Sequence, residues 1–314
     1  MIVNYQDIDP SEWNQYCDQH PAAWFWQTTH FIDYLSVESE NYSFALVEDG
    51  HIKGICPLVF RNGQSVDGYP LPMPVVGYVT YQKACFNSIV PAINFMPKHQ
   101  AVEFNAEITK RLEIANVKQY QVRSSVFSDY QRLDALAFSA CDKKTSVVMD
   151  LHDMDQCWKE IRKSYRPLIN QSTGGVFEVE PGFGISAMLH HATRGKVTRP
   201  IETWREMARW KRLGFARDFA WQNDEDCHGY VGSSFVIVYK NCAYNGVMSV
   251  LDGYFSGFLL WEIAKILSRD GVELFEIGWQ RMAKNPKEEA IEFFRRGMGK
   301  QLKPFFVAGW EGRG

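Results

Sequence analysis

Several features that define other protein classes are missing from this sequence. No run of about 18 apolar residues occurs, so we expect no membrane span. The opening residues, MIVNYQDIDPSEW, lack the basic and apolar segments of a secretory signal, which favours a cytoplasmic location. The seven cysteines are an odd number without a CxxC pair, so they indicate reduced thiols rather than a disulfide framework or a zinc site.

Common signatures of catalysis and metal binding are also absent. No GxGxxG motif follows an expected strand, and no serine–histidine–aspartate order or cysteine nucleophile can be read. His190 and His191 would point about 100° apart on a helix, and no histidine pair at metal-ligand spacing complements them. We therefore expect no metal, although one of the two histidines could accept a proton near neutral pH.

The sequence does contain a large apolar and aromatic fraction. Of its 314 residues, 46% are hydrophobic and 14% are aromatic, with 10 tryptophans. A chain of this length is expected to form two domains with sizeable cores. The aromatic rings suit pockets for sugars or other rings, but large cores would explain them equally well.

Charge is distributed unevenly, although the formal net charge is only −3. Residues 1–158 carry 11 lysines and arginines against 19 aspartates and glutamates, a net charge of −8. Residues 159–217 carry 12 against 5, a net charge of +7. Such a basic field fits a phosphate-rich ligand, and a solvated helical face is the alternative.

The expected helices and strands follow a similar order in each half of the chain. The first half has helices within 11–39, strands that include a hairpin turn at Asp49-Gly50, and then alternating helices and strands. Its later elements are expected at 77–81 (strand), 104–117 (helix), 118–126 (strand), 129–140 (helix) and 144–151 (strand).

The second half begins with a helix over 153–172, which Pro167 kinks or restarts. The remaining helices are expected at 184–196, 200–214, 257–271 and 287–297, and the strands at 176–181, 215–222, 229–240, 242–255, 273–279 and 303–310. This order predicts two α+β units with mixed sheets, with a boundary near residue 150.

Three stretches of the second half carry a resemblance to a known family. They are WKEIRKSYRPLINQS (158–172), the strand–loop–helix–strand segment 245–279 that ends in FEIGW, and FFRRGMG (293–299). In this order they resemble the FemAB-like peptidyl/acyl transferases, a branch of the GNAT superfamily. HPAAWFWQTTHF (20–31) and the strands around GHIKGICPLVF also fit that family, so the resemblance spans most of the chain.

The resemblance implies two tandem GNAT-like (acyl-CoA N-acyltransferase) domains packed together. Residues 1–150 would form the acceptor side and residues 151–314 the donor side, with the last strand packing on the first domain. The sequence departs from the family pattern at two positions, where Arg295 replaces a lysine and Glu276 replaces an aspartate. The helical hairpin with which some members contact transfer RNA is not visible, and the glycine-proline-aspartate element is not clear around MPVVGYVTY.

Three residues are the catalytic candidates. Arg295 could hold a phosphate or stabilise an oxyanion, but a guanidinium cannot shuttle protons. Glu276 and Asp252, at expected strand ends, could accept the proton of an attacking amine. The alternatives are structural: a cation that complements a helix dipole and an acid that only makes hydrogen bonds.

Further residues are candidates for binding the substrates. Arg162 and Arg166 are spaced i, i+4 on one expected helix and would present a shared cationic face. Gly253 and Gly257 would let helix amides approach a pyrophosphate, and an ordinary strand-to-helix turn is the alternative. The complete set for the donor is Arg162, Tyr165, Arg166, Gly253, Gly257, Trp279 and Arg296. Trp24 and His30, with Trp26 and Tyr78, could line an acceptor pocket or belong to the core.

Taken with the resemblance, these residues predict a cytoplasmic N-acyltransferase that works by direct attack, without a permanently bound cofactor. Acyl-CoA is favoured as co-substrate, and the acceptor would be the amine of an amino sugar, a nucleotide-linked cell-envelope precursor or a small molecule. One alternative is aminoacyl-tRNA-dependent transfer to a peptidoglycan or nucleotide-linked precursor. Another is a non-catalytic module that binds a nucleotide sugar or a protein. We expect no DNA partner.

Overall fold

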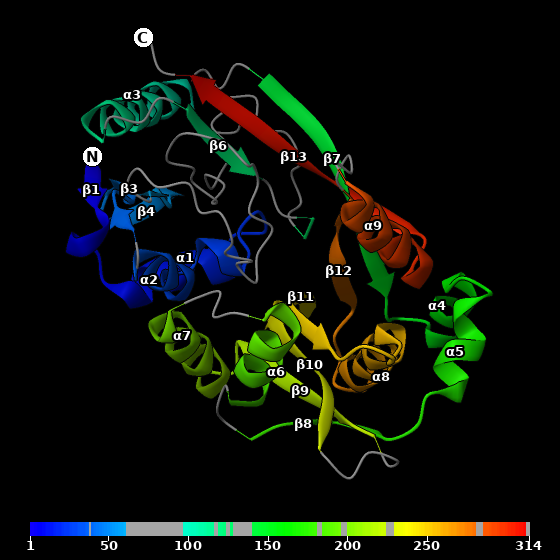
Figure 1. The fold of residues 1–314 in the computed structure, drawn as a ribbon. Coiled ribbons are helices and arrows are strands. Elements are labelled where there is room, and N and C mark those ends of the chain that lie inside the picture. Colours follow the sequence, from blue (N-terminus) through cyan, green and yellow to red (C-terminus); the bar gives the residue numbers. More distant parts are fainter. Residues whose placement is uncertain are drawn as a thin grey trace. The chain divides into compact units, whose positions relative to one another are not determined.

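The computed structural model describes residues 1–37, 39–60, 97–115, 119–123, 126–127, 140–180, 184–195, 200–223, 229–280 and 285–311 (Figure 1). The chain divides into two compact units. Unit 1 comprises Met1–Asp67, Val75–Lys144 and Pro304–Gly314, and unit 2 comprises Gly68–Pro74 and Thr145–Lys303. The strand expected at 77–81, which includes Tyr78, and nearly all of the helix expected at 129–140 lie outside the described residues.

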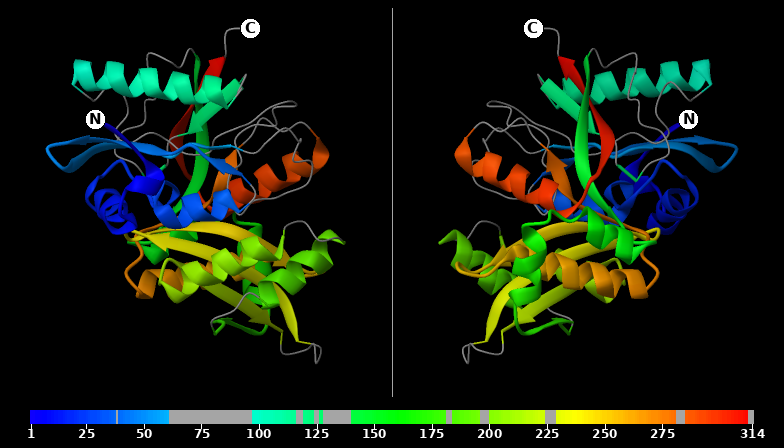
Figure 2. Two further views of the ribbon diagram at one scale, coloured as in Figure 1. Left: turned by 90° about the vertical axis from the view of Figure 1, so that its left-hand side faces the viewer. Right: turned by 90° about the vertical axis from the view of Figure 1, so that its right-hand side faces the viewer.

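Unit 1 contains a small antiparallel sheet in which β3 (Phe44–Glu48) lies between β1 (Ile2–Asn4) and β4 (His51–Cys56) (Figure 2). Asp49 and Gly50 have φ of 52° and 75°, as a two-residue hairpin turn requires, which confirms the turn expected there. The other elements are η1 (Tyr5–Asp7), α1 (Pro10–Gln19), η2 (Phe25–Gln27), α2 (Thr29–Ser36), β2 (Glu40–Asn41), β5 (Val59–Phe60), α3 (Lys98–Ile114) and β6 (Gln119–Arg123).

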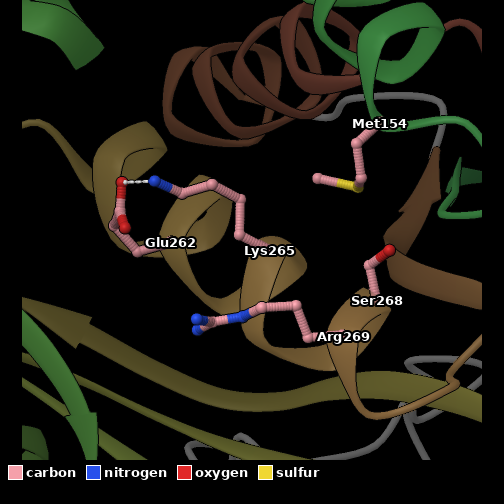
Figure 3. Close-up of a pocket in the computed structure, with 5 residues that line it drawn as sticks. All are labelled: Met154, Glu262, Lys265, Ser268 and Arg269. Carbon is pink, nitrogen blue, oxygen red and sulfur yellow. Dashed lines mark ion pairs between the residues drawn. The ribbon is translucent and has the colours of Figure 1, made fainter.

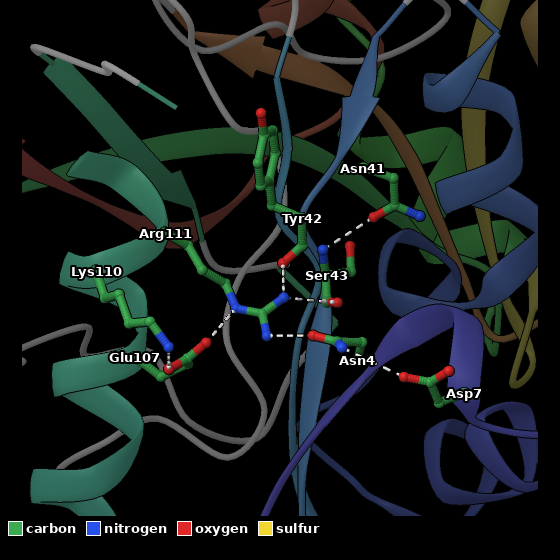
Figure 4. Close-up of polar contacts among 8 residues, drawn as sticks. All are labelled: Asn4, Asp7, Asn41, Tyr42, Ser43, Glu107, Lys110 and Arg111. Atoms are coloured by element: carbon green, nitrogen blue, oxygen red, sulfur yellow. Dashed lines mark hydrogen bonds and ion pairs between the residues drawn. The ribbon is translucent and has the colours of Figure 1, made fainter. Parts of the chain in front are cut away.

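Arg111 on α3 ties this helix to the sheet of unit 1 (Figure 4). Its guanidinium donates to the carbonyl oxygens of Tyr42 and Ser43, at 2.8 and 3.3 Å, and to Asn4 Oδ1 at 2.6 Å. Glu107, one turn earlier on α3, accepts from Arg111 Nε at 2.7 Å. A planar guanidinium can serve several acceptors at once, so one side chain fixes the position of α3 against two chain segments.

Unit 2 is built on a mixed sheet in the order β7-β12-β11-β10-β9-β8. Strands β11 and β12 are parallel, and the other registered neighbours in this unit are antiparallel. The strands are β7 (Ala140–Asp150), β8 (Gly175–Glu178), β9 (Ala216–Gln222), β10 (Tyr230–Tyr239), β11 (Cys242–Val250) and β12 (Leu274–Gln280). Strand β13 (Gln301–Glu311) pairs with β6, and both β7 and β13 pass from one unit to the other.

Helices cover both faces of this sheet. On one face, α8 (Ser256–Arg269) contributes Leu259 and Ile263 to a buried apolar cluster with Phe219 and Phe275. On the other face, the Trp210 ring from α7 (Ile201–Arg212) lies 6.4 Å from that of Phe235. The remaining helices of this unit are α4 (Met154–Glu160), α5 (Tyr165–Gln171), α6 (Gly184–Arg194) and α9 (Pro286–Met298).

Of the two outcomes expected for the helix over 153–172, a kink or a restart, the structure shows a restart, with α4 ending at Glu160 and α5 following. The chain is extended at Ile161 (φ −62°, ψ 135°), and α5 begins only at Tyr165. Pro167 therefore lies in the first turn of α5, where its missing N–H leaves no hydrogen bond unmade. The expectation that Arg162 and Arg166 share a helical face is wrong, because Arg162 lies in the break between the two helices.

The α+β class with mixed sheets is confirmed by these elements. Both units contain helices as well as sheets, and the parallel pair in unit 2 is joined through α8, as parallel strands require. Across the described ranges, no helix combines the length and the apolar character that a membrane crossing needs.

Candidate functional site

The central feature of unit 2 is the separation of β11 from β12. The two strands are in register only at Cys242–Leu274, Ala243–Phe275 and Tyr244–Glu276 within the described chain. Beyond this point β11 stays paired with β10, and β12 stays paired with β7. The separation begins beside a bulge, since the register of β10 and β11 passes over Gly246. Over this separated length, β11 and β12 are therefore not in register with each other.

Glu276 lies at the vertex of this separation and is only 2% exposed. Its Oε1 accepts a hydrogen bond of 2.5 Å from the hydroxyl of Ser146 on β7, which is itself fully buried. Ser146 was not among the sequence candidates, and its only signal was a serine within the apolar run of β7. A carboxylate held in this way keeps one orientation and can accept a proton from a group that reaches it.

Arg295 lies against β12 immediately beyond Glu276. Gly278 has φ of 138°, and a Cβ added there would come within 2.8 Å of Arg295 Cζ. Arg295 Nη1 also donates to the carbonyl oxygen of Trp279 at 2.8 Å. The glycine of FEIGW is thus required both by its backbone conformation and by the close approach of the guanidinium.

The N-terminus of α8 follows the separated end of β11. Asp252 and Gly253 form an exposed turn, and Phe255 at the N-cap provides no side-chain acceptor for the first turn. An added Cβ at Gly257 would overlap the ring of Phe255 and approach Met298 Sδ to 3.0 Å. The first N–H groups of α8 therefore lack a side-chain cap, which is the arrangement that favours an anionic ligand.

An aromatic and cationic cluster joins α5, α8 and α9. The ring of Tyr165 lies directly on Gly297 and makes an edge contact with Phe255, with ring centroids 5.1 Å apart. Arg162 donates through Nη1 to the Tyr165 hydroxyl at 3.2 Å, and its guanidinium lies 3.7 Å from the ring centre of Phe293. Burial raises the pKa of Tyr165, and the charge of Arg162 partly opposes this rise. The structure thus brings Tyr165 to the start of α8, with Arg162 bonded to its hydroxyl.

The remaining candidates of unit 2 lie apart from this cluster. Arg166 turns back to the carbonyl oxygens of Ile161 and Lys159 and so caps the end of α4. Arg296 donates through Nε to Gln280 Oε1 at 2.7 Å on the outer side of α9.

The aromatic candidates of unit 1 are mainly part of its core. Trp24 is 1% exposed, and its ring packs against Trp26 and Phe127 with centroid distances of 4.6 and 4.8 Å. Trp26 is 7% exposed, whereas His30 at the start of α2 is half-buried. In this arrangement Trp24 contributes packing rather than an open surface.

The histidine pair lies on α6. His190 is buried, with its Nδ1 3.5 Å from the hydroxyl of Ser249 on β11, and its ring centre lies 6.4 Å from that of His191. Among the described residues, no group of three histidine, cysteine, aspartate or glutamate side chains is placed to hold a metal ion.

A surface pocket of about 380 Å³ lies beside the later turns of α8 (Figure 3). Lys265 in this pocket pairs with Glu262 at 2.7 Å, and the Ser268 hydroxyl donates to Leu151 O. Met154 and Arg269 complete the lining. At about 1.5 Å per residue, Ser268 lies about 18 Å along the helix from Ser256, so this pocket is separate from the start of α8.

Comparisons with known proteins agree on the fold. No protein-family model and no curated protein sequence matches the chain. Among solved structures, FemX superposes with a TM-score of 0.67 at 13% identity, covering 98% of this chain and 96% of FemX. L-PGS from Bacillus licheniformis gives 0.55 at 10% identity (98% and 93%). A tandem GNAT protein from the clavulanic acid biosynthesis pathway gives 0.53 at 12% identity (99% and 98%). The FemAB-like, tandem GNAT fold expected from the sequence is confirmed.

Proposed function

We propose that this protein is an acyltransferase that moves an acyl or aminoacyl group from a phosphate-bearing donor to an amine. The observation that carries this proposal is the separation of β11 from β12 directly before the uncapped start of α8. An extended donor arm can lie along the separated strands while its phosphates meet the helix N-terminus. The folds of FemX and of the tandem GNAT protein support the same class.

Acyl-CoA is the donor that we favour. The start of α8 would receive its pyrophosphate, with Gly253, beside which an added Cβ would meet open space, giving room for close approach; the space beside Gly257 is taken by the Phe255 ring, so we assign Gly257 no such part. Tyr165 packs on Phe255 at this helix start and Arg162 bonds to its hydroxyl, so these two side chains would contact the same phosphates or the nucleotide. Arg166 is engaged at the end of α4, so we assign it no part in donor binding.

The chemistry requires a neutral amine, a proton acceptor and a stabilised oxyanion. The amine nitrogen attacks the thioester carbonyl, the C–N bond forms, and the C–S bond breaks to release the thiolate of CoA. Glu276 would accept the proton that the amine loses, and the thiolate is then protonated as the free thiol. Arg295 would supply positive charge close to the vertex, since its guanidinium stays protonated.

The acceptor that we propose is the amine of an amino sugar, a nucleotide-linked cell-envelope precursor or a small molecule, in the cytoplasm. Transfer from aminoacyl-tRNA is the second candidate. The net charge of +7 over residues 159–217 favours it, because a polynucleotide carries many phosphates. Donor binding that weakens steeply with rising salt would identify it, because each phosphate contact releases counterions.

Thermal unfolding with added ligand tests the donor. A ligand that binds only the folded state raises Tm, so coenzyme A and acetyl-CoA should raise it and free adenosine should not. Arg162→Ala should weaken this effect, whereas Lys163→Ala, its exposed neighbour, should leave it unchanged. Release of free thiol from acetyl-CoA with glucosamine or other amines then measures transfer. If no CoA ligand or transfer RNA raises Tm and no thiol is released, the binding-module alternative is favoured.

A further inference from the structure

Two buried polar atoms at the end of β12 lack hydrogen-bond partners. Gln280 is 7% exposed and the Glu292 side chain is 12% exposed. Considering only the described part of the chain, neither Gln280 Nε2 nor Glu292 Oε1 makes a hydrogen bond. Gln280 Nε2 is a donor and Glu292 Oε1 is an acceptor. A buried donor or acceptor without a hydrogen bond costs free energy.

Arg296 holds both of these side chains in place. Its Nε donates to Gln280 Oε1 at 2.7 Å, which leaves the NH₂ group of Gln280 as the free end. Its Nη2 lies 3.7 Å from Glu292 Oε2, the other oxygen of that carboxylate. The Arg296 side chain is itself 58% exposed, so the two buried side chains lie next to a residue that reaches the solvent.

The pairing of one donor with one acceptor limits the ligand chemistry. An ammonium group would be opposed by the N–H groups of Gln280, and a phosphate or carboxylate would be repelled by Glu292. A secondary amide satisfies both, because its carbonyl accepts and its N–H donates in fixed directions. This inference rests on the proposed function: a pantetheine arm carries secondary amides, and so does the backbone of a peptide-bearing acceptor.

We propose that Gln280 and Glu292 form a recognition site for a secondary amide of a substrate. The amide oxygen accepts from Gln280 Nε2, and the amide N–H donates to Glu292 Oε1. Arg296 is the positioning residue that orients both groups. The site lies one residue beyond Trp279, whose carbonyl anchors Arg295, so a bound amide would be fixed close to the separated strands.

Isothermal titration calorimetry with three probes tests this site. Coenzyme A carries the pantetheine amides, adenosine 3′,5′-bisphosphate shares its nucleotide without amides, and N-acetylalanine methylamide represents a peptide acceptor. Gln280→Glu keeps the acceptor for Arg296 but removes the NH₂ group, and Glu292→Gln keeps the shape but removes the charge. Glu289→Gln, on the exposed side of the same helix, is the matched control.

In both variants the Kd of one amide-bearing probe should rise about tenfold, as expected for one lost hydrogen bond. The Kd of the bisphosphate should stay unchanged. Weaker coenzyme A binding assigns the site to the donor arm, and weaker binding of the methylamide in the presence of coenzyme A assigns it to the acceptor. If a variant does not fold, NMR spectra of the wild type provide a second test. The side-chain amide signals of Gln280 should shift when the same probe is added.

The opposite results separate this inference from the proposed function. If the wild type binds coenzyme A and both variants bind both amide probes as tightly, the amide site is refuted and the proposed donor stands. The same holds if the Gln280 signals do not respond to either probe. If the wild type binds neither coenzyme A nor the methylamide, both proposals fail.

Discussion

At the scale of single residues, unit 2 holds two buried acids in the same way. Ser146 donates to Glu276 and Ser186 donates to Asp218, each at 2.5 Å. Both acids are at most 2% exposed. A buried carboxylate depends strongly on each hydrogen bond it receives, because water cannot replace a lost donor. Ser146 and Ser186 should therefore influence the orientation and the protonation of these two acids.

Replacement of Ser146 by alanine tests the role of Glu276. We expect kcat to fall about tenfold with little change in KM for the donor, since the hydroxyl positions the acid and does not contact the donor. The acidic limb of the pH–rate profile should move to higher pH, because the carboxylate loses a hydrogen bond to its charged form. Ser233→Ala, another buried serine of the sheet, is the control. An unchanged profile would argue against Glu276 as the base.

The pH dependence of stability should report on Asp218. Burial raises its pKa to about 6, although the Ser186 hydrogen bond and the charge of Lys211 lower it. Between the unfolded value of 3.8 and about 6, the folded state binds more protons than the unfolded state. The free energy of unfolding should therefore fall as pH rises through this window, by at most about 3 kcal/mol.

Asp218→Asn should remove most of this fall, because asparagine does not titrate and can still accept from Ser186. Denaturant unfolding of the wild type and of Asp218→Asn at intervals from pH 4 to pH 7.5 measures the free energy of unfolding of each protein. Parallel curves for the two proteins would show that Asp218 does not titrate in this range.

The residue-level prediction succeeded for local chemistry and missed remote partners. The hairpin turn at Asp49-Gly50 follows from neighbouring residues, so the sequence was sufficient. Glu276 could be chosen as a candidate acid from FEIGW, but Ser146 lies 130 residues away and no local pattern points to it. Trp24 could be either pocket or core from sequence alone, since burial depends on contacts such as that with Phe127.

At the scale of elements, glycine sets how closely helices approach. Gly297 is in the last turn of α9, and the ring of Tyr165 from α5 occupies the space where a side chain would lie. Arg162 N–H also donates to Gly297 O at 2.8 Å, which fixes the break between α4 and α5 against α9. The sequence could not predict this break, because Pro167 is equally compatible with a kink inside one helix.

Gly297→Ala should therefore have the opposite effect from the same change in an exposed helix. Helix propensity alone would stabilise the protein by about 1 kcal/mol. Here the added methyl displaces Tyr165, and we expect a net loss of roughly 1–3 kcal/mol in the free energy of unfolding. In a Tyr165→Ala background the same change should be neutral or stabilising. Equal effects in both backgrounds would contradict the packing described here.

At the scale of the whole molecule, each unit is assembled from separate parts of the chain. Unit 1 includes the start, the middle and the last residues, and the expected boundary near residue 150 stays a prediction. A sequence read in order favours contiguous domains, so a segment that returns after unit 2 gives no local signal. The family resemblance predicts the last strand on the first domain, and the pairing of Val307 with Arg123 shows which strand it meets.

Arg111→Met tests whether unit 1 has its own stability. We expect a loss of roughly 1–3 kcal/mol in the free energy of unfolding, because the part-buried carbonyl groups of Tyr42 and Ser43 lose a charged donor. Hydrogen exchange should accelerate in β3, β4 and α3 and change little in α8 and β10. Lys110→Met, which removes only an exposed ion pair with Glu107, should have little effect. Equal acceleration in both units would show that they open together.

The late position of β13 has a consequence for biosynthesis. β6 leaves the ribosome long before β13, with most of unit 2 translated in between. Until β13 is synthesised, the edge of β6 that pairs with it has no partner strand and is accessible to chaperones or to other nascent chains. Ribosome-arrested chains that end before residue 301 should therefore have a protease-sensitive β6, and the released full-length chain should protect it.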